Sequence, residues 1–125
     1  MSGAELLCLN LNETRRRSIR IWRAIPLSLS DWRPDPDAMS CFEMMRHVLE
    51  ADYLYGQILR DRRSYSFLQL SDDDLNTSSI DRRDVGYIRK AGDFILRIAY
   101  HEAVHAGQML QYLRMAGVPR PSVWD

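Results

Sequence analysis

The chain contains three histidines, His47, His101 and His105. His101 and His105 are four positions apart, so on a helix their side chains rise from one face with Cβ atoms about 5–6 Å apart. Two imidazoles at that separation can bind one metal ion, and His47 from a neighbouring helix would supply a third nitrogen. Three neutral imidazoles leave coordination positions open, as catalytic rather than structural metal sites do. The spacing therefore suggests a three-histidine site for a divalent metal.

The competing interpretation is that each histidine is a core residue hydrogen-bonded to a carbonyl or carboxylate group. The four-residue spacing by itself does not exclude this interpretation. However, burying three imidazoles without partners would cost several kcal/mol, and a shared metal ion removes that cost. Three imidazoles suit several ions, so the residues alone leave the identity of the metal open.

Two polar residues are placed to support the histidines. Gln108 lies three positions after His105, and Glu50 lies three after His47, so each is a candidate to orient a ligand from the second turn of its helix. The alternative for Glu50 is a solvated helix carboxylate. Glu102 is about 100° around the helix from His101, and we expect it to face outward.

Periodicity predicts the helices that must carry these residues. A first helix is expected at about Leu11 to Ile25, beginning at the N-cap spacing of Asn10 and Glu13 and ending at Pro26. Residues 7–12 alternate in the manner of a strand, but no second segment offers a partner. The following stretch, 28–38, contains two prolines and is expected to turn the chain.

The strongest local signal is the S-x-x-E capping box of Ser40 and Glu43. It predicts a helix that begins at Cys41 and ends near Arg62. The predicted inward stripe of this helix has a 3.6-residue period and consists of Met44, His47, Ala51, Leu54 and Ile58.

Residues 80–117 follow a helical pattern that ends at Gly117 with Pro119 beyond it. The pattern fits one long helix or two helices broken around Gly92 and Asp93. Before it, residues 64–79 are polar, Asp72 to Asp74 form an acidic turn or a helix start, and Ser79 is a candidate cap. The sequence thus predicts an all-α bundle, with residues 1–125 as a single domain.

Two motifs resemble those of the DinB-like superfamily of metal-binding four-helix bundles. The segment His101-Glu-Ala-Val-His105-Ala-Gly107-Gln108 resembles the H-x-x-x-H and Gly-Gln signature of that family's last helix. The stretch Asp31-Trp-Arg-Pro, followed by Ser40-x-x-Glu43-x-x-x-His47, resembles the entry to its second helix. The motifs occur in the family order and frame most of the chain.

The resemblance implies an up-down-down-up bundle with zinc, nickel or iron held by His47, His101 and His105. It also implies an activity, because characterised members include bacillithiol and mycothiol S-transferases and a thiol-dependent maleylpyruvate isomerase. The span from His47 to His101 is shorter than the family usually has. The third helix is therefore expected to be short, fused to the fourth, or supplied by a partner in a homodimer. In the related sulfoxide synthases a carboxylate follows the second clustered histidine by two positions. This chain has Gly107 there, which argues against sulfoxide synthase chemistry.

Composition narrows the class of protein. Seventeen basic residues balance seventeen acidic ones, and 46% of the residues are hydrophobic, as in globular proteins. Two cysteines, Cys8 and Cys41, cannot form a disulfide framework, and no secretion signal is recognised, so we expect the cytoplasm. No segment approaches the roughly 18 apolar residues of a membrane helix, so we expect no membrane span.

The arginines of the first helix raise the question of nucleic-acid binding. Since the net charge is zero and no readout motif occurs, we expect a solvated helix face and no nucleic-acid partner. The leading hypothesis is a metal-dependent enzyme acting on a small molecule, a low-molecular-weight thiol being the first candidate. The reaction would be thiol S-transfer or, as the alternative, hydrolysis. The alternative from another class is a non-catalytic, metal-binding or dimerising bundle.

Overall fold

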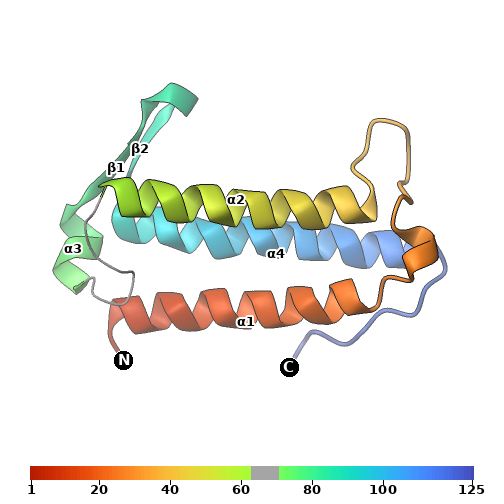
Figure 1. The fold of residues 1–125 in the computed structure, drawn as a ribbon. Helices are drawn as coiled ribbons and strands as arrows, with labels where there is room; N and C mark the ends of the chain where they lie inside the picture. The colour runs from red at the N-terminus through yellow and green to blue at the C-terminus, as the bar shows by residue number, and fades with distance from the viewer. Residues whose placement is uncertain (63–70) are drawn as a thin grey trace.

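Three long helices form the body of the computed structural model, which describes residues 1–62 and 71–125. They are α1 (Gly3–Arg23), α2 (Cys41–Arg62) and α4 (Ala91–Met115). In Figure 1, α1 and α4 run in the same direction and α2 runs opposite to both. None of the described helices is long and apolar enough to cross a membrane.

The shorter elements include a one-and-a-half-turn helix and a β-hairpin, both at the end of the molecule where α1 begins and α2 ends (Figure 1). The helix is α3 (Asp72–Thr77), and the antiparallel strands are β1 (Ser79–Arg82) and β2 (Tyr87–Lys90). Two single-turn 3-10 helices, Leu27–Leu29 and Arg83–Val85, lie in connections. Where a four-helix bundle has a third long helix, this chain has α3, so the expectation of a short third helix is confirmed.

The first helix begins eight residues earlier than predicted. The Ser2 hydroxyl accepts a hydrogen bond from the Glu5 amide (3.1 Å), and the Glu5 carboxylate accepts one from the Ser2 amide (2.7 Å). This capping box starts α1 at Gly3. The prediction of a start at Leu11 was wrong because Asn10 and Glu13 imitate the same spacing inside the helix. The alternating residues 7–12 are helical.

The second helix is placed as predicted. The Glu43 carboxylate accepts from the Ser40 amide (2.8 Å) and the Ser40 hydroxyl accepts from the Glu43 amide (3.1 Å), so α2 begins at Cys41. The described part of α2 extends to Arg62. The predicted stripe is wrong at Leu54, which is 47% exposed. Val48, one turn before Asp52, is buried in the core instead.

The prediction of helix over residues 80–90 was wrong. Ser79 begins β1 rather than capping a helix, and Ile80, fully buried, pairs with Arg89. The turn between the strands contains Gly86, whose φ of 94° favours glycine. Helix α4 then begins at Ala91 and runs unbroken through Gly92. The acidic run 72–74 forms the first turn of α3, capped by Ser71, and residues 64–70 of the polar stretch lie outside the described residues.

A glycine allows α3 to pack against the first turn of α4. A Cβ atom on Gly92 would lie 3.3 Å from both the carbonyl oxygen and the Cβ of Leu75. Leu75 is buried there with Ile95 and Ala4, which brings α1, α3 and α4 together. The close approach depends on the missing side chain.

The main core lies toward the opposite end of the bundle. It is built by α1, α2 and α4, and its buried members are Ile21, Ile25, Cys41, Met44, Met109, Leu113 and Val123. The connection after α1 folds over this core through Trp32, whose ring meets Tyr112 edge-on at 5.4 Å. Tyr112 also donates a hydrogen bond to the Met39 carbonyl (2.9 Å). These contacts fix the entry to α2.

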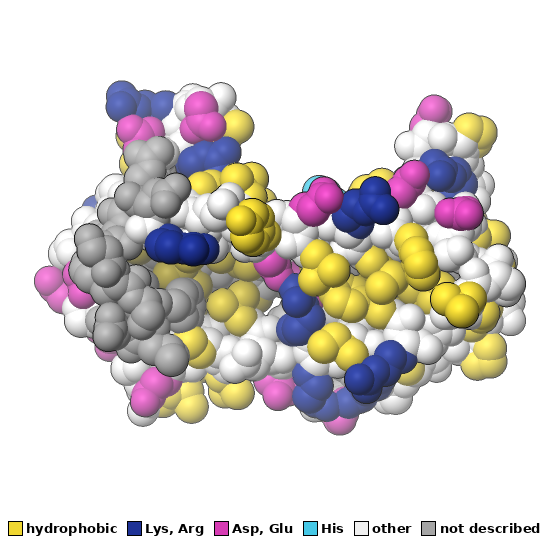
Figure 2. All heavy atoms as spheres, viewed as in Figure 1, with side chains coloured by type: hydrophobic (Ala, Val, Ile, Leu, Met, Phe, Trp, Pro, Cys, Tyr) yellow, Lys and Arg dark blue, Asp and Glu magenta, His cyan; other side chains and the backbone are white. Residues whose placement is uncertain are grey.

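Most arginines of α1 hold neighbouring acidic groups and the C-terminal tail. Arg16 and Arg17 pair with Glu13, Arg17 also donates to the Val123 carbonyl (3.0 Å), and Arg20 donates to the Ser122 carbonyl (2.6 Å). Figure 2 shows Lys and Arg side chains gathered over the second half of α1. The arginines of α1 therefore mostly make ion pairs and hydrogen bonds within the protein, whereas the sequence predicted a solvated helix face.

Two glycines on long helices provide a matched test of this packing. A Cβ atom added to Gly56 of α2 would have no described atom within 4 Å, whereas one added to Gly92 would meet Leu75. We expect Gly56→Ala to raise the free energy of unfolding by about 0.5–1 kcal/mol, through lower entropy of the unfolded chain. For Gly92→Ala we expect no such increase, because the added Cβ atom would crowd Leu75 and offset the entropy effect. Urea unfolding of both variants measures the difference, and equal stabilisation would contradict the described α3–α4 contact.

Candidate metal centre

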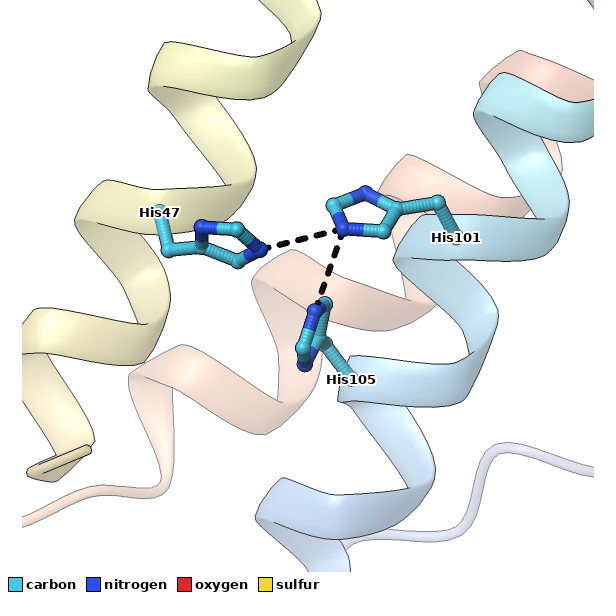
Figure 3. A group of neighbouring side chains, drawn as sticks. All are labelled: His47, His101 and His105. Carbon is cyan, nitrogen blue, oxygen red and sulfur yellow. Dashed lines mark hydrogen bonds between the residues drawn. The ribbon is translucent and has the colours of Figure 1, made fainter. Parts of the chain in front are cut away.

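The three histidines converge between α2 and α4. His47 projects from the second turn of α2, and His101 and His105 project from consecutive turns of α4 (Figure 3). The Nε2 atom of His101 lies 3.1 Å from Nε2 of His47 and 3.2 Å from Nε2 of His105. One nitrogen from each ring lies within 4.8 Å of the other two. The helices therefore bring three imidazole nitrogens close together, and the predicted clustering of the three histidines is confirmed.

Hydrogen bonding alone does not satisfy this arrangement. His105 donates its Nδ1 proton to Gln108, so its neutral ring presents a bare Nε2. His101 Nε2 can then donate a proton to one neighbour, but it cannot also accept from the other with the same nitrogen. In at least one of the two Nε2–Nε2 contacts, therefore, either neither nitrogen or both nitrogens carry a proton, and no hydrogen bond forms. A cation bound by all three lone pairs removes the conflict, so the residues fit a metal ion.

The two predicted supporting residues lie in different surroundings. The Gln108 side-chain oxygen is 2.7 Å from Nδ1 of His105, and this contact orients the ring with Nε2 toward the other histidines. Glu50 is exposed on α2 and makes no hydrogen bond to His47. A Cβ atom on Gly107, two positions after His105, would have no described atom within 4 Å.

His101 is the central ring of the group. Its Nδ1 atom is buried without a hydrogen-bond partner among the described residues, so its polar contacts are made through Nε2. Burial, followed by the charges of His105 and His47, lowers the pKa of His101. The neutral ring is the form that can bind a metal, and this environment favours it near neutral pH.

Glu102, expected to face outward, is buried instead. Only 3% of its side chain is exposed, and it accepts two hydrogen bonds from Arg15 of α1, at 2.7 and 3.0 Å. Arg15 also pairs with Asp52 of α2. The expectation failed because α1 packs on the side of α4 next to the histidine face. A carboxylate there is buried against a helix and needs a cation.

The ion group of Arg15, Glu102 and Asp52 connects all three long helices beside the histidines. Burial, and then the negative charge of Glu102, raises the pKa of Asp52 to about 6, although Arg15 opposes the shift. The same two carboxylates raise the pKa of Arg15. One cation thus serves two acids, and Asp52 is the acid whose charge is less well compensated.

A sequence signal for this group exists. Arg15 lies four residues after Leu11 and three before the buried Ser18, so it occupies the inward stripe of α1. Asp52 continues the buried stripe of α2 four residues after Val48. A charged residue at an inward position needs an opposite charge nearby. The inward positions of Arg15 on α1 and Asp52 on α2 together indicate an ion pair between these two residues.

The cysteines lie away from the histidines. Cys41 is 2% exposed in the main core, as expected for a structural cysteine, and burial raises its pKa. Burial also raises the pKa of Cys8. Neither thiol is activated by its surroundings.

The whole chain resembles a solved structure. It superposes on the crystal structure of a DinB-like protein, YjoA, from Bacillus subtilis with a TM-score of 0.75. The match covers 94% of this chain and 96% of that one, at 17% sequence identity.

The fold is DinB-like. The superposition confirms the all-α, DinB-like bundle predicted from the two motifs. No family model matches the sequence, and no curated protein does either. At 17% identity the likeness shows the DinB-like fold alone, so any activity has to be argued from the site.

The raised pKa of Asp52 predicts a pH-dependent stability. The folded state binds the Asp52 proton more tightly than the unfolded chain, where the carboxyl titrates near 4. Its stabilising contribution is therefore present below about pH 4 and is lost as the pH rises through about 6. We expect Asp52→Asn to gain about 1–2 kcal/mol relative to the unsubstituted protein over this range, after solvent screening.

Urea unfolding at pH 4, 5, 6 and 7 measures this difference between the two proteins. Asp37→Asn is a matched control because Asp37 is exposed on the connection before α2, and its difference from the unsubstituted protein should stay flat. A flat difference for Asp52→Asn would show that the carboxyl titrates normally.

Proposed function

We propose that this protein is a divalent-metal-dependent enzyme that acts on a small molecule, with thiol S-transfer as its reaction. The observation that carries the proposal is the convergence of the three Nε2 atoms, which hydrogen bonding does not satisfy. Zinc, nickel and iron all suit three imidazoles. The DinB-like fold and the two sequence motifs support the same conclusion.

Each residue of the group has a distinct part in this proposal. His47, His101 and His105 would hold the ion, and Gln108 would keep His105 in the tautomer that presents Nε2. The ion would supply Lewis acidity, which lowers the pKa of a thiol or water at the site. The ion group of Arg15, Glu102 and Asp52 keeps α1, α2 and α4 in register, so that the ligands from two helices meet.

The nucleophile would come from a co-substrate, because Cys41 is buried in the core and burial raises the pKa of both cysteines. In the proposed transfer the small thiol loses its proton to solvent or to a base. Its sulfur then forms a bond to an electrophilic carbon of the second substrate. The leaving group departs with the electron pair of the broken bond, so no external oxidant or reductant is needed. We propose that the reaction occurs in the cytoplasm, where thiols are reduced.

A non-catalytic bundle that dimerises is the second candidate. Exposed hydrophobic side chains on α2 and α4 favour it, since a short third helix covers less of these faces. They are Leu49, Tyr53, Leu96, Tyr100 and Val104. A homodimer is compatible with catalysis as well, so oligomeric state alone does not separate the two candidates.

Metal content is the direct test of the proposed site. Protein purified without a histidine tag should contain about one divalent ion per chain by elemental analysis. His101→Ala should lose it, because His101 contacts both other rings. The exposed Arg114→Gln, on the same helix, should retain it. Absence of metal from the unsubstituted protein, including after incubation with zinc, nickel or iron, would contradict the proposal.

Activity separates the enzyme from the non-catalytic candidate. The loaded protein should accelerate coupling of a low-molecular-weight thiol to an electrophile such as 1-chloro-2,4-dinitrobenzene, and His47→Ala should abolish the acceleration. Stoichiometric metal without acceleration across a panel of thiols and electrophiles would favour the second candidate. The affinity for the metal should also fall as the pH drops below about 6.5, because protons compete for the imidazoles.

Gln108 provides a finer test of the ligand geometry. Removing its oxygen frees the His105 ring to rotate and to change tautomer, so Gln108→Leu should weaken metal binding about 10-fold or more. Glu50→Gln is the matched control on α2, because Glu50 makes no hydrogen bond to His47. Competition with a chromophoric chelator measures both affinities. Equal affinity in the two variants would show that the His105 orientation does not depend on Gln108.

A further inference from the structure

A pocket next to His101 is not used by the metal site itself. It has a volume of about 210 Å³ and lies between α2, β2 and the first half of α4. His101 is part of its wall, so a molecule in the pocket would lie against one of the three clustered histidines. Its other lining residues include Tyr55, Tyr87, Arg89, Phe94, Arg97 and Tyr100.

The pocket is lined on one side by aromatic rings. Tyr55 meets Phe94 edge-on, with ring centroids 5.7 Å apart, and meets His101 in the same way at 6.2 Å. On β2, alternate residues face inward, so Tyr87 and Arg89 point to the same side of the hairpin. The Arg89 guanidinium lies over the Tyr87 ring at 4.7 Å from its centroid. Aromatic rings at these positions favour a planar, apolar ligand body.

The pocket also carries an excess of positive charge. Arg89 and Arg97 both bind one carboxylate, that of Asp93, at 3.3 and 2.8 Å. Arg97 uses its Nε atom for this bond, so its terminal amines remain available as donors, and Arg97 is one of the residues that line the pocket. Two cations for one anion leave about one unit of positive charge, although the chain as a whole is neutral. A single guanidinium group can bind a carboxylate by two parallel hydrogen bonds.

We propose that this pocket binds a small planar carboxylic acid, with its carboxylate on Arg89 and Arg97 and its flat body against Tyr55 and Phe94. The inference rests on the proposed function in one respect, that the end of the acid nearest His101 is the part that reacts. It names the second substrate of that site as an anionic, planar acid that carries the electrophilic carbon and the leaving group of the proposed transfer at the end nearest His101. The volume limits this acid to a small molecule.

Binding of a simple probe tests the pocket separately from catalysis. The probes are 4-fluorobenzoate and its neutral counterpart 4-fluorobenzamide, titrated with the full chain and followed by fluorine NMR. We expect the benzoate to bind at least 10-fold more tightly than the amide. Arg97→Gln and Arg89→Gln should each weaken benzoate binding at least fivefold, whereas Arg114→Gln, an exposed arginine of the same helix, should leave it unchanged.

Titrating both metal-loaded and chelator-treated protein separates this inference from the proposed function. If the arginine-dependent preference for benzoate persists after metal removal, the pocket and not the ion binds the carboxylate. Equal binding of benzoate and benzamide, or unchanged binding in both arginine variants, would overturn the inference and leave the metal site standing. Arginine-dependent benzoate binding by a protein that never takes up metal would uphold the pocket and overturn the proposed function.

Discussion

The burial of Glu102 in the middle of the bundle is the constraint on which the rest of the structure depends. A carboxylate that is 3% exposed requires a cation, and Arg15 of α1 supplies it through two hydrogen bonds. The same guanidinium reaches Asp52 of α2. A slide of one residue along a helix moves a side chain by 1.5 Å and rotates it by 100°, which would break these bonds. The ion group therefore fixes how the three long helices are aligned.

The histidine cluster depends on that alignment. His101 directly precedes Glu102 on α4, and His47 lies five residues before Asp52 on α2. Fixing Glu102 and Asp52 around one arginine brings the two histidine-bearing turns opposite each other. Without it, the hydrophobic contacts of α2 with α4 would set the spacing of the helices but not their register with the same specificity. On both α2 and α4, a residue of the ion group thus lies within a turn and a half of a clustered histidine.

Features encoded by a few adjacent residues could be predicted from the sequence. The Ser40 and Glu43 box gave the first residue of α2, and the spacing of His101 and His105 gave a shared face of α4. Features that depend on packing between distant segments could not. Helix periodicity alone points Glu102 outward until α1 is placed beside α4, and the hairpin is hidden because Tyr87 continues the helical spacing of the residues after it. Four-residue strands carry too little pattern to oppose that spacing.

The sequence separation of the histidines has a further consequence for stability. His47 and His101 are 54 positions apart, and α3 and the hairpin lie between them. An ion held by both would act as a cross-link that closes this long loop, and it would reduce the chain entropy of the unfolded state if it stayed bound there. The loop-closure estimate used for disulfides gives about 4 kcal/mol for a loop of this size. Since a whole domain is stabilised by only about 5–15 kcal/mol, an ion chosen for chemistry would also be a substantial part of what holds this small bundle closed.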